Sequence, residues 1–545
     1  MGKFNNTKES VKPTEINDMG SPAFKLGKKE ELVSIGLTTF LQPSYYETES
    51  EITKRIISLI NKNDPIFVAK VALYLRRIAN MRSVSHLIAG ELARHISGMT
   101  WAGDFYKKIV VRPDDMTEIL AYVFHNQAKR KIPNAIRRGF AEVLQNLDPY
   151  QIDKYKMNNR NIKLIDLVNL LHPKPQQKNA EAYRRLLIGK PLDDLYENKT
   201  FEKTMSSVGE DAKDVGATIE EIDDMKGEVM MTLLSQPQGM PIMSLLRNLR
   251  NLLLYCPQGV PLAVKQLTNE NAIINSKQLP FRFGSAYNVI SALQDPKGTK
   301  SVSFENDGLS FKEGQIQLLE ALETALHISC QNIPVLGGNT AILTDHSGSV
   351  RGDAGGSGKL SAFGVTTSAM VGNLMSTLFA FSQENVYIGL FGDRLINVPV
   401  DRSKGIMEFN QYSFAEGGKC GPGTEDGLYV FLDNCIREKI RVDNLIIFSD
   451  MVIGDGGKGR WDSSSGVYRR LGYKSFQDLF RQFKVINPKC STISINIRDT
   501  KGTSVFDRSM NVTQVAGWSS ALFDSIKNAT RGYDELIKEI EAVQI

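Results

Sequence analysis

The residues with the clearest chemical potential are an aspartate and two serines at alternate positions, in the run Asp345-His346-Ser347-Gly348-Ser349. In an extended chain, side chains two residues apart lie on the same side, so one carboxylate and two hydroxyls converge. These are hard oxygen ligands of the kind that Mg²⁺ prefers, and Mn²⁺ also accepts them. An aspartate that caps a turn closed by serines would give the same pattern, and this simpler interpretation stays open.

Two more oxygen donors follow at positions where such a site needs them. Asp450 comes directly after the apolar run Asn444–Ser449, and Thr424 follows the glycine-rich segment Gly417–Gly423. In an open parallel sheet the ligand crevice lies at the carboxyl ends of the strands, so Asp345 and Asp450 are expected to meet there. The sequence therefore predicts a site for a divalent metal ion formed by Asp345, Ser347, Ser349, Thr424 and Asp450.

The predicted site lacks a positioned general base, which a hydrolytic site needs to activate a metal-bound water. His346 lies on the opposite side of the extended chain from the ligands, and the other five of the six histidines lie earlier, in the helical part of the chain. We therefore expect a binding protein and not an enzyme. Because few carboxylates reach the ion, it would keep exchangeable water positions for a carboxylate or phosphate of a partner.

Around this site the sequence alternates between short apolar strands and helices. Strand patterns cover residues 341–344, 386–391, 445–449 and 493–497, and helical patterns cover residues 361–382, 425–440, 475–486 and 520–531. Such alternation predicts parallel βαβ units with helices on both faces, and thus a doubly wound α/β domain over residues 333–545. The glycine-rich segments 352–358, 417–423 and 454–460 are predicted to be loops.

The part of the chain before this domain has helical periodicity. Apolar residues recur at helical spacing, as in Phe67, Val71, Tyr74 and Ile78, and prolines separate the segments. The pattern predicts stacked antiparallel helix pairs, an α-solenoid, over residues 30–332. Residues 1–29 are expected to be a poorly ordered N-terminal extension.

The formal net charge of +5 conceals a local excess of positive charge. Residues 51–200 contain 26 Lys and Arg against 15 Asp and Glu, whereas residues 201–350 contain 11 against 17. A surplus confined to one region favours binding to a polyanion, although solvated helix faces would give the same count. The surplus includes the clusters Arg76/Arg77/Arg82, Arg137/Arg138, Lys154/Lys156 and Arg184/Arg185.

Composition also bears on the cellular compartment. The five cysteines form no CxxC pair, which is typical of reduced thiols in the cytoplasm, and the first ten residues lack the apolar core of a secretory signal. The stretch between Lys359 and Glu384 is uncharged, but its serines, threonines and asparagine favour a buried helix over a membrane span. We therefore expect a cytoplasmic protein that does not enter the membrane.

The metal-site pattern resembles the metal-ion-dependent adhesion site of von Willebrand factor A domains. Together with the basic helical region, it resembles the TROVE-domain family, which includes the Ro ribonucleoprotein autoantigen and its bacterial relatives. Ile165–Pro175 is similar to the family's D-L-x-x-L-x-H-x-K-P element, and Met240–Leu249 to its M-P-x-x-x-L-L-R-N-L helix. Further similarity lies at Leu279–Phe281, Val515–Trp518 and Phe523–Ile526.

The resemblance implies HEAT-like repeats closed into a ring by the von Willebrand factor A domain. It implies that single-stranded 3′ ends of misfolded noncoding RNAs enter a basic hole, and that small Y-type RNAs bind the outer surface, in RNA quality control or processing. We also expect a monomer, with an exoribonuclease or another protein as a partner at the metal site. The insertion Asp455–Tyr473 has no counterpart in the family.

The resemblance and the charge clusters together indicate the RNA-binding residues. His172 and Lys174 lie on the matching motif, whereas Asn169 stands where relatives often have arginine. Arg247 either binds phosphate or holds neighbouring helices through an ion pair. The predicted contacts to RNA are Arg76, Arg77, Arg82, Arg137, Arg138, Lys154, Lys156, His172, Lys174, Arg184 and Arg185.

Two other classes of function stay open beside RNA binding. A protein-interaction adaptor would hold an acidic residue of its partner through Mg²⁺ and use the solenoid as a second docking surface. A metal-dependent hydrolase would need an activated water and a base, and incubation of RNA with Mg²⁺ would reveal it.

Overall fold

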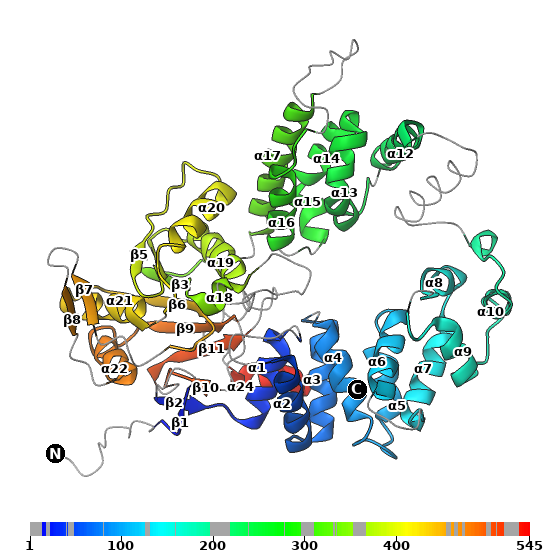
Figure 1. Cartoon of the computed structure of the whole chain (residues 1–545), viewed down its shortest axis with the longest axis horizontal. Coiled ribbons are helices and arrows are strands. Elements are labelled where there is room, and N and C mark those ends of the chain that lie inside the picture. The colour runs from blue at the N-terminus through cyan, green and yellow to red at the C-terminus, as the bar shows by residue number, and fades with distance from the viewer. Residues whose placement is uncertain are drawn as a thin grey trace. The chain divides into compact units, whose positions relative to one another are not determined.

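The computed structural model of the chain is drawn in Figure 1. It describes residues 13–17, 22–39, 41, 48–79, 81–125, 131–157, 160–196, 219–237, 239–276, 278, 280–295, 310–330, 333, 335–352, 367–423, 425–453, 459–462, 467–470, 475–497, 503–507, 510–516 and 533–545. Several sequence-based predictions fall outside these ranges, namely Thr424, the helix at residues 520–531 and most of the glycine-rich segment 352–358.

The chain forms two compact units. The first unit comprises residues 1–196, 334–400 and 412–545, and the second comprises residues 197–333 and 401–411. The helices before residue 196 therefore belong with the sheet, whereas the sequence pattern groups all of residues 30–332 together.

The first unit contains a six-stranded sheet made of β3 (Thr340–Asp345), β4 (Val386–Phe391), β5 (Leu395–Asn397), β6 (Asn444–Ser449), β9 (Ser491–Asn496) and β11 (Val512–Ala516). The strands lie in the order β11-β9-β6-β3-β4-β5, and all neighbours are parallel except β5, which runs antiparallel to β4. The four predicted apolar runs coincide with β3, β4, β6 and β9. The pattern does not predict β5 or β11.

Helices α19 (Ser368–Ser382), α21 (Glu425–Arg437) and α22 (Phe476–Ile486) cover the two faces of this sheet. Two more helices contact α19: α18 (Gly348–Arg351) packs on it, and the Ser413 hydroxyl of α20 (Ile406–Gly417) donates to Asn373. On one face, α21 and α22 share a hydrophobic core with side chains of β3 and β6, such as Leu343 and Ile447. On the other face α19 packs on β3, where the hydroxyls of Thr344 and Ser376 lie 2.6 Å apart. Because the central strands are buried on both faces, their sequences are continuous apolar runs.

The N-terminal part of the first unit is a succession of helices, each packed on helices one or two places along the chain (Figure 1). Side-chain caps and prolines set their starts, as at Thr48, Asp64 and Pro65, and one hydrophobic cluster runs through them all. They are α1 (Lys28–Thr38), α2 (Glu49–Lys62), α3 (Pro65–Arg77), α4 (Arg82–Leu92), α5 (Ala102–Ile109), α6 (Pro113–His125), α7 (Asn134–Asn146), α8 (Pro149–Lys154), α9 (Leu164–Leu171) and α10 (Ala180–Leu187), followed by the short 3₁₀ helix η1 (Asp193–Leu195).

The two ends of the chain take part in the first unit. β1 (Glu15–Ile16), β2 (Pro22–Lys25) and β10 (Thr503–Ser504) form a small antiparallel sheet. The last helix, α24 (Tyr533–Ala542), packs on α1 and α3, and the Nζ of Lys29 lies 2.5 Å from a carboxylate oxygen of Glu541. Part of the expected N-terminal extension 1–29 is therefore regular structure, because it is paired with strand and helix residues from the far end of the sequence.

The second unit consists of helices that pack on one another: α12 (Ile219–Leu234), α13 (Ile242–Tyr255), α14 (Val260–Leu267), α15 (Glu270–Ser276), α16 (Pro280–Ser291) and α17 (Phe311–Ser329), with the 3₁₀ helix η2 (Pro257–Gly259). The insertion Asp455–Tyr473 contains a hairpin of β7 (Gly459–Asp462) and β8 (Val467–Arg470). Its first strand begins inside segment 454–460, which the glycine content predicts to be a loop. Within the described parts of the chain, every helix is too short or too polar to cross a bilayer.

Candidate metal centre and nucleic-acid interface

The predicted metal ligands lie at the carboxyl ends of two adjacent central strands. β3 ends at Asp345, and Asp450 comes directly after β6, its parallel neighbour. Both aspartates are almost completely buried, at 0 % and 1 % exposure. This placement follows from the parallel register, which brings strand ends that are 105 positions apart in the sequence to one edge of the sheet.

A chain of hydrogen bonds links the four described candidate ligands. The amide of Ser347 donates to Oδ1 of Asp345 over 2.9 Å, and the hydroxyls of Ser347 and Ser349 lie 3.2 Å apart. The Ser349 hydroxyl then donates to Oδ2 of Asp450 over 2.6 Å. The structure thus brings Asp345, Ser347, Ser349 and Asp450 together, while Thr424 lies outside the described residues.

One member of this cluster, Ser449, is not among the ligands predicted from the sequence. Its hydroxyl donates to Oδ2 of Asp345 over 2.6 Å and also accepts a hydrogen bond from the amide of Met451. Its position as the last residue of a central strand, next to Asp450, could have indicated that Ser449 belongs to the site. Both oxygens of the Asp345 carboxylate therefore already accept hydrogen bonds from neighbouring serines.

The electrostatics of the cluster favour a cation. Burial, followed by the nearby charge of Asp450, raises the pKa of Asp345 well above its usual range, and the hydrogen bonds from Ser449 and Ser347 oppose this shift only in part. In the described residues no group of three or more His, Cys, Asp or Glu side chains is placed to hold a metal ion. The donors present are two carboxylates and two hydroxyls, a hard oxygen set that fits Mg²⁺ if water completes the shell.

His346 faces a separate group of residues. Arg351 donates to its Nδ1 over 2.8 Å, so the neutral ring can donate from Nε2 to Oδ1 of Asn373, 3.2 Å away. Burial, followed by the charge of Arg351, lowers the pKa of His346 to about 3. The ring is therefore neutral at neutral pH, and its contacts connect α18 to α19.

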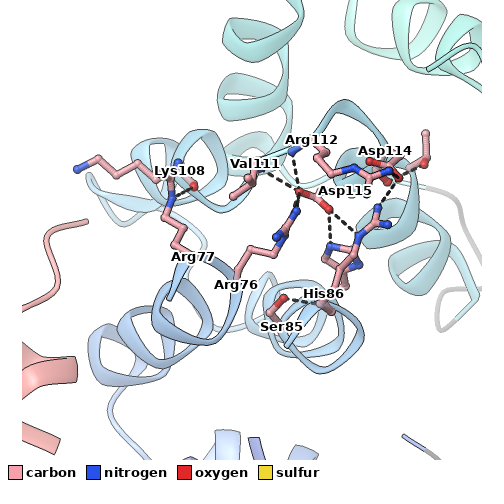
Figure 2. Close-up of polar contacts among 11 residues, drawn as sticks. Arg76, Arg77, Ser85, His86, Lys108, Val111, Arg112, Asp114 and Asp115 are labelled. Atoms are coloured by element: carbon pink, nitrogen blue, oxygen red, sulfur yellow. Dashed lines mark hydrogen bonds and ion pairs between the residues drawn. The ribbon is translucent and has the colours of Figure 1, made fainter. Parts of the chain in front are cut away.

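Among the predicted RNA contacts, Arg76 has a different role. Arg76 is 5 % exposed, and its guanidinium donates to Oδ2 of Asp115 from Nε (3.1 Å) and Nη2 (2.8 Å), as Figure 2 shows. Asp115 stands in the first turn of α6 and is fully buried. Arg76 is thus corrected from an RNA contact to one half of a buried ion pair, because its charge is already neutralised inside the protein.

The same aspartate organises a larger cluster (Figure 2). Arg82 bonds to both Asp114 and Asp115, and His86 lies 3.0 Å from the Asp115 carboxylate. Burial by itself would raise the pKa of Asp115, but hydrogen bonds from His86, Arg76 and the amide of Arg112 bring that pKa well below its usual range. The charge of Arg82 is thus neutralised as well, which argues against its predicted contact with RNA.

Four more of the predicted cations have protein partners. Arg77 is exposed but donates to the carbonyl of Lys108 over 2.6 Å. Arg184 and Arg185 both bond to Glu181, and Arg185 also bonds to Asp194. Lys156 lies 2.5 Å from Asp153. Because each of the last three lies against a carboxylate, their contribution to a cationic surface is smaller than the charge count suggests.

The remaining predicted contacts are exposed and lie between residues 137 and 174. Arg137 donates to the carbonyl of Leu170 over 3.0 Å, which ties α7 to the end of α9. His172 follows at once, with a φ of 45° that turns the chain towards Lys174. The exposed side chains of this group are Arg137, Arg138, Lys154, His172 and Lys174.

Comparison with known proteins agrees with these features. Residues 223–318 match the family model of the TROVE domain, which includes the segment Met240–Leu249. This match confirms the resemblance to the TROVE-domain family over the matched residues. Its fold is similar to that in the crystal structure of the Deinococcus radiodurans RO (RSR) protein, with a TM-score of 0.56 and 14 % identity, over 93 % of this chain and 99 % of that one. No curated protein sequence matches the chain.

Proposed function

We propose that the chain is the RNA-binding protein of a ribonucleoprotein, with small Y-type RNAs and the single-stranded 3′ ends of misfolded noncoding RNAs as its ligands. The observation that carries this proposal is the exposed basic group Arg137, Arg138, Lys154, His172 and Lys174, in a chain whose residues 223–318 match the TROVE-domain model. A role in RNA quality control or processing, HEAT-like repeats closed into a ring, and a cytoplasmic location belong to the same proposal.

Neutralisation of phosphates is the main physical contribution of such a surface. Each contacted phosphate releases counterions, and the logarithm of the binding constant falls with the logarithm of salt concentration by about 0.9 per contact on a duplex and about 0.7 on a single strand. Such contacts position the RNA without reading its sequence. We therefore expect steep salt dependence and weak sequence preference.

The proposal is tested by titrating an RNA hairpin that carries a single-stranded 3′ tail, and the same hairpin without a tail, at salt concentrations from about 50 to 200 mM. The tailed RNA should bind more tightly, and Arg137→Glu with Arg138→Glu should lower the salt slope by about two. Arg441→Glu is the matched control, because Arg441 is a highly exposed arginine at the amino end of β6. Equal slopes for the two variants, or affinity that does not change with salt, would refute the proposal.

We also propose that the sheet domain is a von Willebrand factor A domain with a Mg²⁺ site. Asp345, Ser347, Ser349, Asp450 and Thr424 would hold the ion, and the hydrogen-bonded cluster of the first four supports this ligand set. A bound ion would supply a position at which a carboxylate of another molecule replaces water. The hydrogen bonds from Ser347 and Ser449 orient the Asp345 carboxylate.

A second candidate function rests on the same cluster, namely a protein-interaction adaptor that binds an exoribonuclease or another acidic partner through the ion. It is favoured by the absence of a base among the described residues that touch the four ligands, with His346 engaged by Arg351 and Asn373. Calorimetric titration with Mg²⁺ and Mn²⁺ should show binding that Ser349→Ala weakens. Capture of an exoribonuclease that requires Mg²⁺ and survives RNase would support the adaptor, and RNA cleaved by the purified protein would contradict both functions.

A further inference from the structure

A group of aromatic rings and cations surrounds the short helix α8. The Lys154 Nζ lies 5.4 Å from the ring centroid of Tyr150 and 5.8 Å from that of Tyr155. The Arg112 guanidinium lies 5.6 Å from the Tyr155 ring, and the rings of Tyr150 and Tyr196 meet edge to face at 5.5 Å. We call these five residues the tyrosine–cation cluster.

Polar contacts hold the members of this cluster in place. The Lys154 Nζ donates to the hydroxyl of Tyr150 over 3.0 Å, and the hydroxyl of Tyr196 donates to the carboxylate of Asp153. Arg112 bonds to Asp114, yet its side chain is 49 % exposed, and the three tyrosines are half-buried. The rings are therefore fixed at their ends while part of their surface remains at the protein–water boundary.

We infer that the tyrosine–cation cluster stacks the bases of single-stranded RNA and that Arg112 and Lys154 bind the adjoining phosphates. The inference rests on the proposed function and names the part of the RNA that this surface takes. Rings interleaved with cations are what a single strand requires, because every base has a face for stacking and every linkage has a negative charge. A duplex keeps its bases stacked inside, so the ligand is an unpaired segment.

The surrounding charge supports a nucleic acid in this position. The cluster lies in the part of the sequence with 26 basic against 15 acidic residues, and Lys154 is one of the exposed cations between residues 137 and 174. The alternative is that the rings and cations only stabilise the packing of α8 against η1 and the chain before α6. The two interpretations predict different effects on RNA binding when the aromatic ring is removed. Stacking on a base needs the aromatic face and does not need the tyrosine hydroxyl.

The test uses the full-length chain and a short single-stranded RNA with 2-aminopurine at successive positions. Tyr150→Leu with Tyr155→Leu should weaken binding by about fivefold or more, and should abolish the fluorescence change of the stacked 2-aminopurine. Tyr150→Phe with Tyr155→Phe should keep both affinity and fluorescence change. Tyr412→Leu, which removes an exposed tyrosine of α20, should behave as wild type.

The outcomes separate the inference from the proposed function and from a folding defect. If the wild type binds no RNA, the proposed function fails and the inference with it. If the wild type binds RNA and the leucine pair binds equally well, only the inference is overturned. Thermal melting and circular dichroism accompany each variant, and a leucine pair that is folded as wild type but stacks no 2-aminopurine supports the inference. If that pair melts early, the single substitution Tyr155→Leu decides the question by the same two readouts.

Discussion

Asp115 is expected to be one of the most sensitive single positions for the stability of the first unit. Its carboxylate accepts hydrogen bonds from Arg76, Arg82 and His86, and from the amides of Val111 and Arg112, all between 2.8 and 3.1 Å. Asp115→Asn keeps the shape of the side chain but replaces one acceptor oxygen by a donor and removes the charge. Arg76 is then left buried without a counter-charge, and its N–H groups can face the amide N–H donors of the asparagine.

The magnitude follows from the burial of both partners. Removing one side of a buried ion pair typically costs about 3–5 kcal/mol, because the other charge stays desolvated without compensation. We expect about 3–4 kcal/mol for Asp115→Asn, since the asparagine keeps one acceptor and Arg82 retains Asp114. Asp114→Asn is the matched control, and about 1 kcal/mol is expected because its partners Arg82 and Arg112 are one third to one half exposed.

Urea unfolding followed by circular dichroism measures both free energies. The loss for Asp115→Asn should change little with salt, because buried pairs are weakly screened. The folded-state pKa of Asp115 lies below its unfolded value of 3.8, so its contribution is complete above that value and decreases as the pH falls below it. The combined change Arg76→Met with Asp115→Asn should cost less than Asp115→Asn alone, because the buried guanidinium that would lack its partner is removed as well. A loss below about 1 kcal/mol for Asp115→Asn would show that the pair is not an essential part of the core.

Three other predictions concern packing, pH and the metal centre. Gly139→Ala should lower the free energy of unfolding by about 1–3 kcal/mol, because a Cβ there would lie 2.6 Å from the carbonyl oxygen of Gly103; thermal melting measures this, and an unchanged midpoint contradicts it. Burial lowers the pKa of Lys484 from 10.5 to about 8, so the folded state releases this proton before the unfolded state does. The free energy of unfolding of the wild type should therefore rise by about 1–3 kcal/mol between these pH values relative to Lys484→Met. Parallel curves of unfolding free energy against pH for the two proteins would exclude the effect. Ser449→Ala should cost about 1–3 kcal/mol in the metal-free protein, since it removes a donor from buried Asp345; urea unfolding without Mg²⁺ is the check, and stability equal to wild type would refute it.

The proximity of Asp345 and Asp450 could be predicted because it depends on two local signals and one general rule. Apolar runs mark β3 and β6, and the rule for parallel sheets then places Asp345 and Asp450 at one edge without any knowledge of their contacts. The same apolar pattern does not predict β5 or β11. β5 has only three residues, and in β11 the polar Thr513 and Gln514 interrupt the apolar pattern, although both are buried.

The RNA-contact residues were harder to predict because a count of charged residues does not show which of them form ion pairs inside the protein. Arg76 and Asp115 are 39 positions apart, and nothing in either segment indicates that α3 and α6 place them together. The grouping of the helices before residue 196 with the sheet has a similar cause, since α24 packs on α1 and α3 from the opposite end of the chain. Contacts between distant segments are what periodicity and composition leave undetermined.

Leaving out the cations that have carboxylate partners narrows the candidate RNA surface. Among the predicted RNA contacts, those with carboxylate partners lie around Asp115 and around Glu181, apart from Lys156, which lies against Asp153. Apart from Arg77, which donates to a carbonyl, the other predicted contacts are exposed residues between 137 and 174, and Lys154 belongs both to this set and to the tyrosine–cation cluster. A surface that combines exposed positive charge with aromatic rings suits flexible single strands, because the charge binds the backbone and the rings stack on the bases. Substitutions in this stretch should therefore affect tailed RNA more than blunt duplex, whereas substitutions around Asp115 should affect both through stability alone.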